Sequence, residues 1–200
     1  MTNVLTDILD RPDSKTQMDD DEALALSVWR NPAAFDELYN RHVQRVYRYL
    51  AARVGNTDDA QDLTAQTFMA VLEGLTGRRA GYWPSNRFIL WVLSIARHKA
   101  ADHFRRHRQP LPLEAALEVA DTAPPPEESV GRQLRLEQVA RMLRTLAPDR
   151  AEALALRIFG GLSAAEVGQV MGKHESAVKM LVHRAVRDLQ QRLAAREIDE

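Results

Sequence analysis

The stretch GLSAAEVGQVMGKHESAVKMLVHRAVRDLQQRL, residues 161–193, decides the fold of the C-terminal part of the chain. Ser163 and Glu166 stand at the S-x-x-E spacing of a capping box, in which two side chains satisfy backbone N–H groups at a helix start. Gly172 allows a tight turn after that helix. Because apolar residues recur at helical spacing on both sides of the glycine, the stretch predicts a helix-turn-helix. The inward-facing residues are Val167, Val170, Met171, Val178, Leu181 and Val182.

The second helix of a helix-turn-helix enters the major groove of DNA with its N-terminal turns. There a glutamate accepts from the amine of cytosine, and a lysine or histidine donates to guanine. The alternative is a plain αα-hairpin with a solvated polar face, but the turn spacing favours the helix-turn-helix. The outward-facing residues that reach bases or phosphates are Glu175, Ser176, Lys179, Met180, His183 and Arg184.

Composition predicts an all-α protein that works in the cytoplasm. The chain has 200 residues, of which 45% are hydrophobic, and its content of helix-favouring residues argues against a sheet. It has no cysteine, which excludes a disulfide framework and a thiolate zinc site. The N-terminus lacks the pattern of a secretory signal, and no apolar stretch is long enough to cross a bilayer. We therefore expect no membrane insertion.

The N-terminal region is predicted to contain a disordered tail over residues 1–19, followed by a short helix in DDDEALALSVWRN. Pro32 opens a longer helix that ends near Gly55. One face of this helix is apolar and is expected to be buried. Its residues are Phe35, Leu38, Tyr39, Val43, Val46, Tyr47, Leu50 and Val54.

The next helix is expected to be capped by Thr57, with Asp58 and Asp59 in its first turn. It is followed by a loop over residues 76–86, which contain two glycines and a proline. The buried stripe of the helix is expected to be Ala60, Leu63, Thr67, Phe68, Val71, Leu72 and Leu75.

A basic helix follows the loop. Residues 87–110 carry six bases against one acid, in a chain whose formal net charge is -1. Aromatic residues, among them Tyr82 and Trp83 in the loop, precede the bases, and this combination suits single-stranded nucleic acid. The apolar positions of the helix also fit a simple core role. They are Phe88, Trp91, Val92, Ile95, Ala96 and Phe104.

An acidic, proline-rich linker at residues 109–127 separates two predicted domains. The first domain covers residues 20–108 and the second residues 128–200. In the second, a helix from about Glu127 to Leu146 leads to a helix that Pro148 opens. The Gly160–Gly161 pair ends that helix. The predicted fold class is two small helical domains, a helical bundle and a helix-turn-helix.

His103 and His107 stand four residues apart on one helical face and raise the question of a metal site. Zinc needs at least three protein ligands, and no further ligand cluster is evident. We therefore expect no metal and no cofactor. Asp102 is expected to pair instead with Arg106 or with His98, each at four-residue spacing.

Taken together, the motifs resemble the extracytoplasmic-function (group 4) RNA polymerase sigma factors of the sigma-70 family. AFDELYNRHVQRVYRYL resembles the opening of region 2, and DDAQDLTAQTFMAVL resembles its polymerase-binding helix. FILWVLSIARHKAADHFRR resembles the helix for the minus-10 element. LAPDRAEALALRIFGGLSAAEVGQVMGKHESAVKMLVHRAVRDL resembles region 4, which reads the minus-35 element as duplex. The resemblance covers about residues 33–108 and 128–193.

The resemblance implies a transcription initiation subunit, not an enzyme, whose partners are core RNA polymerase (β′ clamp and β subunit), promoter DNA and an anti-sigma factor. The residues implied to bind the β′ clamp are Asp62, Leu63, Thr67 and Phe68. Those implied to bind the melted minus-10 element are Trp83, Asn86, Arg97, Lys99, Arg105 and Arg106. The residues implied to bind the minus-35 element are the six outward-facing residues of the helix-turn-helix named above.

Two other hypotheses remain open at this point. A helix-turn-helix repressor or activator would bind duplex operator DNA by itself, usually as a dimer. A helical hydrolase would use His103, His107 and Asp102, but these residues lack the organised carboxylate cluster that metal-assisted hydrolysis needs.

Overall fold

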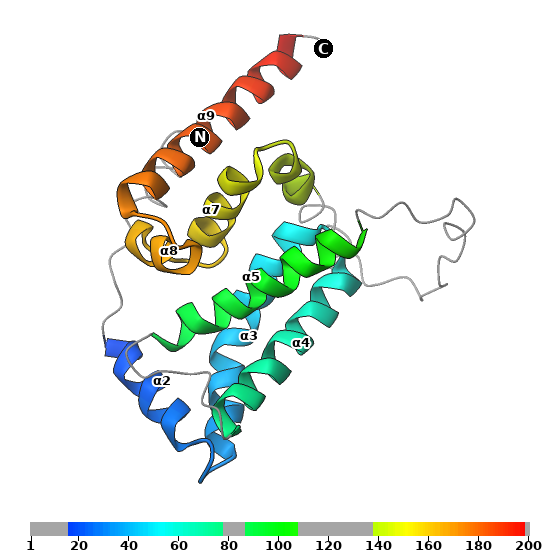
Figure 1. Ribbon diagram of the computed structural model, residues 1–200. Helices are drawn as coiled ribbons and strands as arrows, with labels where there is room; N and C mark the ends of the chain where they lie inside the picture. Colours follow the sequence, from blue (N-terminus) through cyan, green and yellow to red (C-terminus); the bar gives the residue numbers. More distant parts are fainter. Residues whose placement is uncertain (1–15, 78–86, 108–137, 199–200) are drawn as a thin grey trace, which may run out of the picture.

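The protein is described by a computed structural model, shown in Figure 1, which covers residues 16–77, 87–107 and 138–198. Regular secondary structure in these ranges is helical throughout, which confirms the predicted all-α class. Two groups of helices are visible. Helices α2 to α5 form the N-terminal module, and the helices after residue 137 form the C-terminal module.

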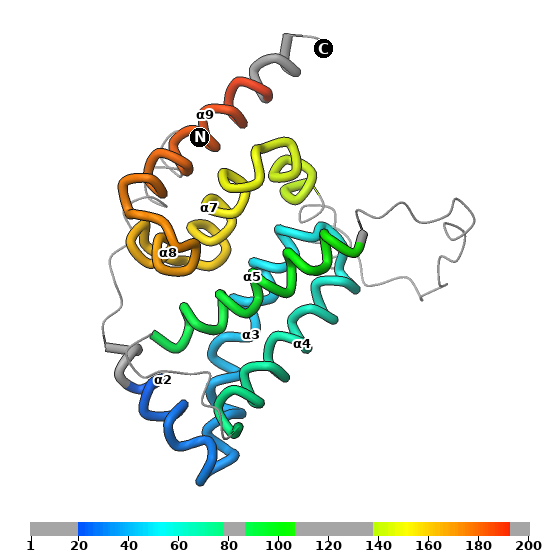
Figure 2. The backbone as a smooth tube through the Cα atoms, viewed as in Figure 1, coloured from blue at the N-terminus to red at the C-terminus, as the bar shows by residue number. Residues whose placement is uncertain are grey.

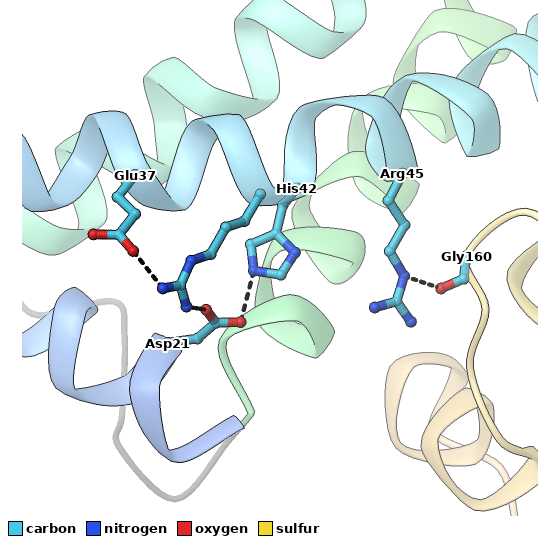
Figure 3. Close-up of polar contacts among 6 residues, drawn as sticks. Asp21, Glu37, His42, Arg45 and Gly160 are labelled. Atoms are coloured by element: carbon cyan, nitrogen blue, oxygen red, sulfur yellow. Dashed lines mark hydrogen bonds and ion pairs between the residues drawn. The ribbon is translucent and has the colours of Figure 1, made fainter. Parts of the chain in front are cut away.

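Helix α2 spans Thr16–Ser27, so it begins inside the stretch that the sequence predicted to be a disordered tail. Residues 1–15 lie outside the described part. Asp21 fixes α2 to the next helix: its carboxylate lies 2.9 Å from Arg41 Nη1 and 2.7 Å from His42 Nε2 (Figure 3). The side chains of Asp21 and His42 are both buried, which explains why this short helix holds its place.

Helix α3 spans Ala33–Val54 and ends, as predicted, at Gly55. Gly55 takes a left-handed φ of 74°, and its N–H donates to the carbonyl of Ala51. Two aromatic residues on α3 differ from the predicted stripe. Tyr39 is 40% exposed and only its ring packs, edge-on, against Phe68, whereas Tyr49 was not predicted and is fully buried.

Helix α4 spans Thr57–Thr76, and its cap is Asn56 rather than the predicted Thr57. The Asn56 side chain accepts from the N–H groups of Asp58, at 2.8 Å, and Asp59, at 3.4 Å. Thr57 is already the first helical residue, so its hydroxyl comes one position too late to cap. The predicted stripe is buried or half-buried except for Leu72, which is exposed.

Helix α5 spans Phe88–His107 and lies against α2, α3, α4 and α8. Because neighbours surround it, it buries more than the single stripe that periodicity predicts. The additional buried residues are Ile89, Leu90, Leu93 and Ala100.

The C-terminal module begins, in the described part, with helical residues 138–144 and a turn at Thr145. The predicted start of that helix at Glu127 lies outside the described residues. Helix α7 spans Pro148–Ile158 with the proline at its first turn, as predicted. Helices α8, Ala164–Met171, and α9, Glu175–Ile198, follow.

The two modules pack directly against each other. Helices α7 and α8 lie on α3 and α5, and the backbone trace of Figure 2 shows α9 on the side of α7 and α8 that faces away from the N-terminal module. The buried apolar residues of both modules form one continuous cluster. The sequence predicted two domains and a linker between them, but it gave no indication of this contact.

Candidate nucleic-acid interface

The helix-turn-helix forms as its sequence predicts. The Ser163 N–H donates to Glu166 Oε2 at 2.6 Å, and the Glu166 N–H donates to Ser163 Oγ at 3.3 Å, which completes the capping box at the start of α8. Gly172 ends α8 with a left-handed φ of 65°. Val178 and Val182 on α9 are buried against the rest of the module, while Leu181 is half-buried. The turn therefore fixes α9 so that its opposite face points outward.

All six residues predicted to reach the minus-35 element are exposed on α9. Met180 is 50% exposed and is an apolar side chain among charged and polar neighbours on this face. Lys179 Nζ lies 2.6 Å from Glu175 Oε1, and this pair lowers the pKa of Glu175. Glu175 is therefore ionised at neutral pH and is able to accept a hydrogen bond from a base.

Sequence reasoning missed Arg187, which is also exposed on α9. It stands seven residues after Met180 and three after Arg184, a spacing that continues the same broad face by about one further turn. The helical period of α9 could therefore have predicted that Arg187 shares the face of the six residues named for DNA contact. A guanidinium at this distance from the helix start suits a phosphate better than a base edge.

The basic residues of α5 divide into two groups. Arg105 and Arg106 are exposed near the end of the helix, while Arg97 and Lys99 are half-buried. Arg105 Nη2 lies 2.9 Å from Asp102 Oδ1, so the acid pairs three residues along rather than with the predicted Arg106 or His98. Trp83 and Asn86 lie outside the described residues.

A ring nitrogen of His98 and one of His103 each have a partner within the protein. His98 Nδ1 lies 2.7 Å from the carbonyl of Ser94, and His103 Nε2 lies 3.6 Å from Asp59 Oδ2. Over residues 16–77, 87–107 and 138–198, no three metal-binding side chains come together. His107 is part of α5, but its side chain is not described.

The four residues predicted to bind polymerase all lie on α4, but only one of them is exposed at the surface of the protein. Asp62 is exposed and accepts from Gln66 Nε2 at 2.6 Å. The other three are buried on the core side of the helix, as the predicted apolar stripe requires: they are Leu63, Thr67 and Phe68. Met69 and Leu72, exposed on the same helix, were not predicted as contacts.

Arg87 is a further residue that sequence reasoning missed. It precedes α5 and pairs with Glu166, the capping-box glutamate of α8. Burial raises the pKa of Glu166, but the hydrogen bonds of Ser163 and the charge of Arg87 outweigh burial and lower it. One carboxylate therefore holds the start of α8 and the start of α5 together.

None of the helices in the described part of the chain is both long enough and apolar enough to cross a membrane.

Comparison with known proteins gives matches in both modules. The family model "Sigma-70 region 2" matches residues 38–109, and "Sigma-70, region 4" matches residues 136–189. The chain is 39% identical over 160 residues to the ECF RNA polymerase sigma factor BldN of Streptomyces coelicolor. That match covers 78% of this chain but only 59% of BldN, so the chain spans little more than half of that relative's length.

Two further comparisons cover nearly whole proteins. RNA polymerase sigma factor CarQ of Myxococcus xanthus is 33% identical over 170 residues, covering 83% of this chain and 92% of CarQ. Among solved structures, CnrH in complex with the cytosolic domain of CnrY superimposes with a TM-score of 0.70. The two share 24% identity, and the superposition covers 88% of this chain and 98% of CnrH, which supports the likeness in fold.

Proposed function

The chain belongs to the extracytoplasmic-function RNA polymerase sigma factors of the sigma-70 family, and we propose that it is a dissociable transcription initiation factor of a bacterial RNA polymerase. In this role it binds the core enzyme, recognises duplex minus-35 and melted minus-10 DNA, and promotes promoter opening. The observation that carries the proposal is the presence of both modules in order, region 2 and then region 4. A repressor or activator that binds an operator by itself has no need of region 2.

The minus-35 element is assigned to α9. Its exposed face combines a carboxylate, an ammonium, a histidine and an arginine within the first three turns, which offers both donors and acceptors to a major groove. We assign base contacts to Glu175, Ser176, Lys179 and Met180, and phosphate or base contacts to His183 and Arg184. Arg187 extends the set toward the phosphate backbone.

The minus-10 element is assigned to α5 and the loop before it. Arg97, Lys99, Arg105 and Arg106 supply cations for the phosphates of the separated strand, and Trp83 and Asn86 are proposed to capture an unstacked base. Extruding a base costs a few kcal/mol, and stacking or pocketing it returns about 1–3 kcal/mol. The remainder has to come from the polymerase, because only a complex that binds open DNA more tightly than closed DNA favours melting.

Core polymerase is assigned to the exposed side of α4, with Asp62 as the acidic contact to the β′ clamp and Met69 and Leu72 as apolar neighbours. Contact with the β subunit is proposed for the whole factor. An anti-sigma factor is a further proposed partner, and the solved relative CnrH was determined in complex with the cytosolic domain of CnrY. The site of action is then the cytoplasm, where the polymerase is. The role requires no catalysis and no cofactor.

The proposed domains keep the boundaries that the sequence suggested. Residues 20–108 are assigned to core and minus-10 binding, and residues 128–200 to minus-35 binding. Residues 109–127 form the acidic linker between them. Residues 1–19 are the remaining tail, although α2 already begins at Thr16.

The test is run-off transcription with sigma-free core polymerase on a library of promoter sequences, combined with a gel shift in the presence and absence of core. We expect site-selective RNA synthesis and promoter binding only when core and factor are both present. Tight binding of a palindromic duplex by the factor alone, without selective transcription, would overturn the proposal in favour of an autonomous regulator.

The polymerase contact is tested by Asp62→Arg. Reversing an exposed charge opposite basic side chains is expected to weaken core binding about 10-fold or more while the protein stays folded. Asp20→Arg is the control, because it reverses an exposed acid on α2. Co-purification with core and circular dichroism are the measurements. Unchanged co-purification of Asp62→Arg would refute the assignment of this residue.

A further inference from the structure

The junction between the two modules contains a buried carboxylate. Glu152 on α7 is 8% exposed, and both of its oxygens are held by α3 of the other module. The Tyr49 hydroxyl donates to Oε1 at 2.5 Å, and Arg53 Nη2 lies 3.2 Å from Oε2. Burial, and then the charge of Glu152, raise the pKa of Tyr49, so the hydroxyl keeps its proton and remains a donor.

Other polar contacts cross the same junction. Arg45 on α3 donates to the carbonyls of Gly160 and Gly161, the latter at 3.0 Å, and Figure 3 shows its side chain reaching the loop after α7. Arg144 Nη1 donates to the carbonyl of Val54 at 3.4 Å. Arg87 pairs with Glu166 where α8 meets α5. The modules are therefore held in one defined arrangement rather than by unspecific apolar contact.

Among the described residues two ion pairs cross the junction, and the pair of Glu152 is the more deeply buried: the side chains of Arg53 and Glu152 are 12% and 11% exposed, against 26% and 13% for Arg87 and Glu166. A buried ion whose partner is removed is strongly destabilising, because the remaining charge is neither hydrated nor paired. When the modules separate, Glu152 and Arg53 return to water and lose this constraint. Arg53 Nε is buried without a hydrogen-bond partner in the described part of the chain, so closure leaves one donor unsatisfied. The junction is thus specific but able to open.

The closed arrangement does not fit simultaneous binding of the two promoter elements. A compact chain of 200 residues is roughly 40 Å across. Elements about 25 base pairs apart are about 85 Å apart along a B-form duplex. Residues 108–137 join the modules, and a fully extended chain of that length reaches about 100 Å. The modules must therefore separate, and the connection is long enough to let them.

We propose that Glu152 is the latch of this protein: its contacts with Tyr49 and Arg53 hold region 4 docked on region 2 in a closed state. The need for opening rests on the proposed function. The latch itself rests on the contacts at the junction. In the closed state Arg87 is engaged by Glu166, while the proposed minus-35 face of α9 stays exposed.

Distances between the modules test the latch without any partner. The chain has no cysteine, so Gln61→Cys on α4 and Gln190→Cys on α9, both exposed, give two specific sites for spin labels. Pulsed electron paramagnetic resonance of the labelled full chain is expected to show one short, narrow distance distribution. Glu152→Ala is expected to lower the ratio of closed to open molecules about 100-fold and to add long, broad distances.

The matched control is Asp149→Ala, which removes an exposed ion pair with Lys173 from the same helix α7 but inside one module. It is expected to leave the distances unchanged. A wild-type protein with broad, long distances would overturn the closed state. A Glu152→Ala protein with wild-type distances would overturn the latch.

A double variant separates a broken latch from a misfolded module. Glu152→Gln and Arg53→Met each leave one buried charge unpaired and are expected to open the protein. Combined, they leave a neutral junction in which the glutamine still accepts from Tyr49, so the short distance is expected to return. Failure of the double variant to close while circular dichroism stays normal would argue against the ion pair as the latch.

These outcomes are independent of the transcription assay. If the latch variants open but the wild-type protein directs no transcription with core, the latch stands and the proposed function falls. If transcription succeeds and Glu152→Ala remains closed, the proposed function stands and the latch falls.

Discussion

Asp21 is a carboxylate buried between α2 and α3, and its partners decide its ionisation. Burial alone raises its pKa, but the hydrogen bonds and charges of His42 and Arg41 outweigh burial and lower the pKa below the ordinary value of 3.8. A depressed pKa in the folded state means that the unfolded state binds protons more readily. The resulting stability is fully present above the unfolded pKa and is lost as the pH falls through the folded pKa.

Asp21→Asn is therefore expected to destabilise the protein by about 2 kcal/mol near neutral pH. The difference in melting temperature from the wild type should shrink as the pH falls below about 4, where the wild type loses the same charge. Thermal unfolding followed by circular dichroism across this pH range is the measurement. A difference that stays constant down to about pH 2 would show that the carboxylate charge is not the cause.

Asn56 rather than Thr57 caps α4, and the two residues give a direct comparison. Asn56→Ala is expected to cost about 1 kcal/mol of unfolding free energy, since two backbone N–H groups lose their acceptor. Thr57→Ala serves as the control and is expected to change stability by at most a few tenths of a kcal/mol. Chemical denaturation checks both. A larger cost for Thr57→Ala would contradict the cap assignment.

At the scale of single elements, α9 combines two kinds of contact along one exposed face. Lys179 lies in the turns that enter a major groove, whereas Arg187 lies further along, where the helix leaves the bases. A base contact and a phosphate contact respond differently to DNA sequence and to salt. The two residues therefore test how α9 divides recognition from anchoring.

Lys179→Ala in the holoenzyme is expected to weaken minus-35 binding about 10-fold and to relax selectivity at one base pair. Arg187→Ala is expected to weaken binding to all sequences alike. It is also expected to reduce the slope of log affinity against log salt concentration by about one, the contribution of one phosphate contact. Binding titrations over a set of singly altered promoters at several salt concentrations measure both. Equal loss of selectivity in the two variants would contradict the division of α9.

Helix α5 shows how an element can be misjudged when it has several neighbours. Periodicity assigned one apolar face to the core and left the basic residues to solvent. In the structure α5 touches helices of both modules, so Leu90 and Leu93 are buried as well and Arg97 is only half-exposed. Its position lets α5 carry the basic residues of the minus-10 proposal and also contact the C-terminal module through α8.

At the scale of the whole molecule, the two modules share one buried apolar cluster. Domains that share a core unfold together, whereas domains joined only by a linker unfold separately. The buried contact of Glu152 with α3 adds a polar component to this coupling. Thermal unfolding therefore reports on the junction.

The wild-type chain is expected to unfold in a single calorimetric transition. Glu152→Ala is expected to split it into two, because each module then unfolds with little help from the other. Differential scanning calorimetry measures this, with Asp149→Ala as the control that keeps one transition. Two transitions in the wild-type protein would show that the modules are already independent.

Features set by residues a few positions apart could be predicted from the sequence. The capping box of Ser163 and Glu166, the proline that opens α7 and the glycines that end α3 and α8 all depend on local backbone geometry. The exposed face of α9 followed in the same way from the helical period. The start of α4 was misplaced by one residue because Asn56 and Thr57 are both good caps.

The sequence by itself determined the all-α class, the helix-turn-helix and the family. Only the tertiary structure decided that Tyr49 and Glu152 meet, that Arg87 pairs with Glu166, and that the two modules share one core. The physical reason is distance along the chain. A helix start or turn is fixed by neighbours within one or two turns, whereas Tyr49 and Glu152 are 103 residues apart and meet only when both modules have folded.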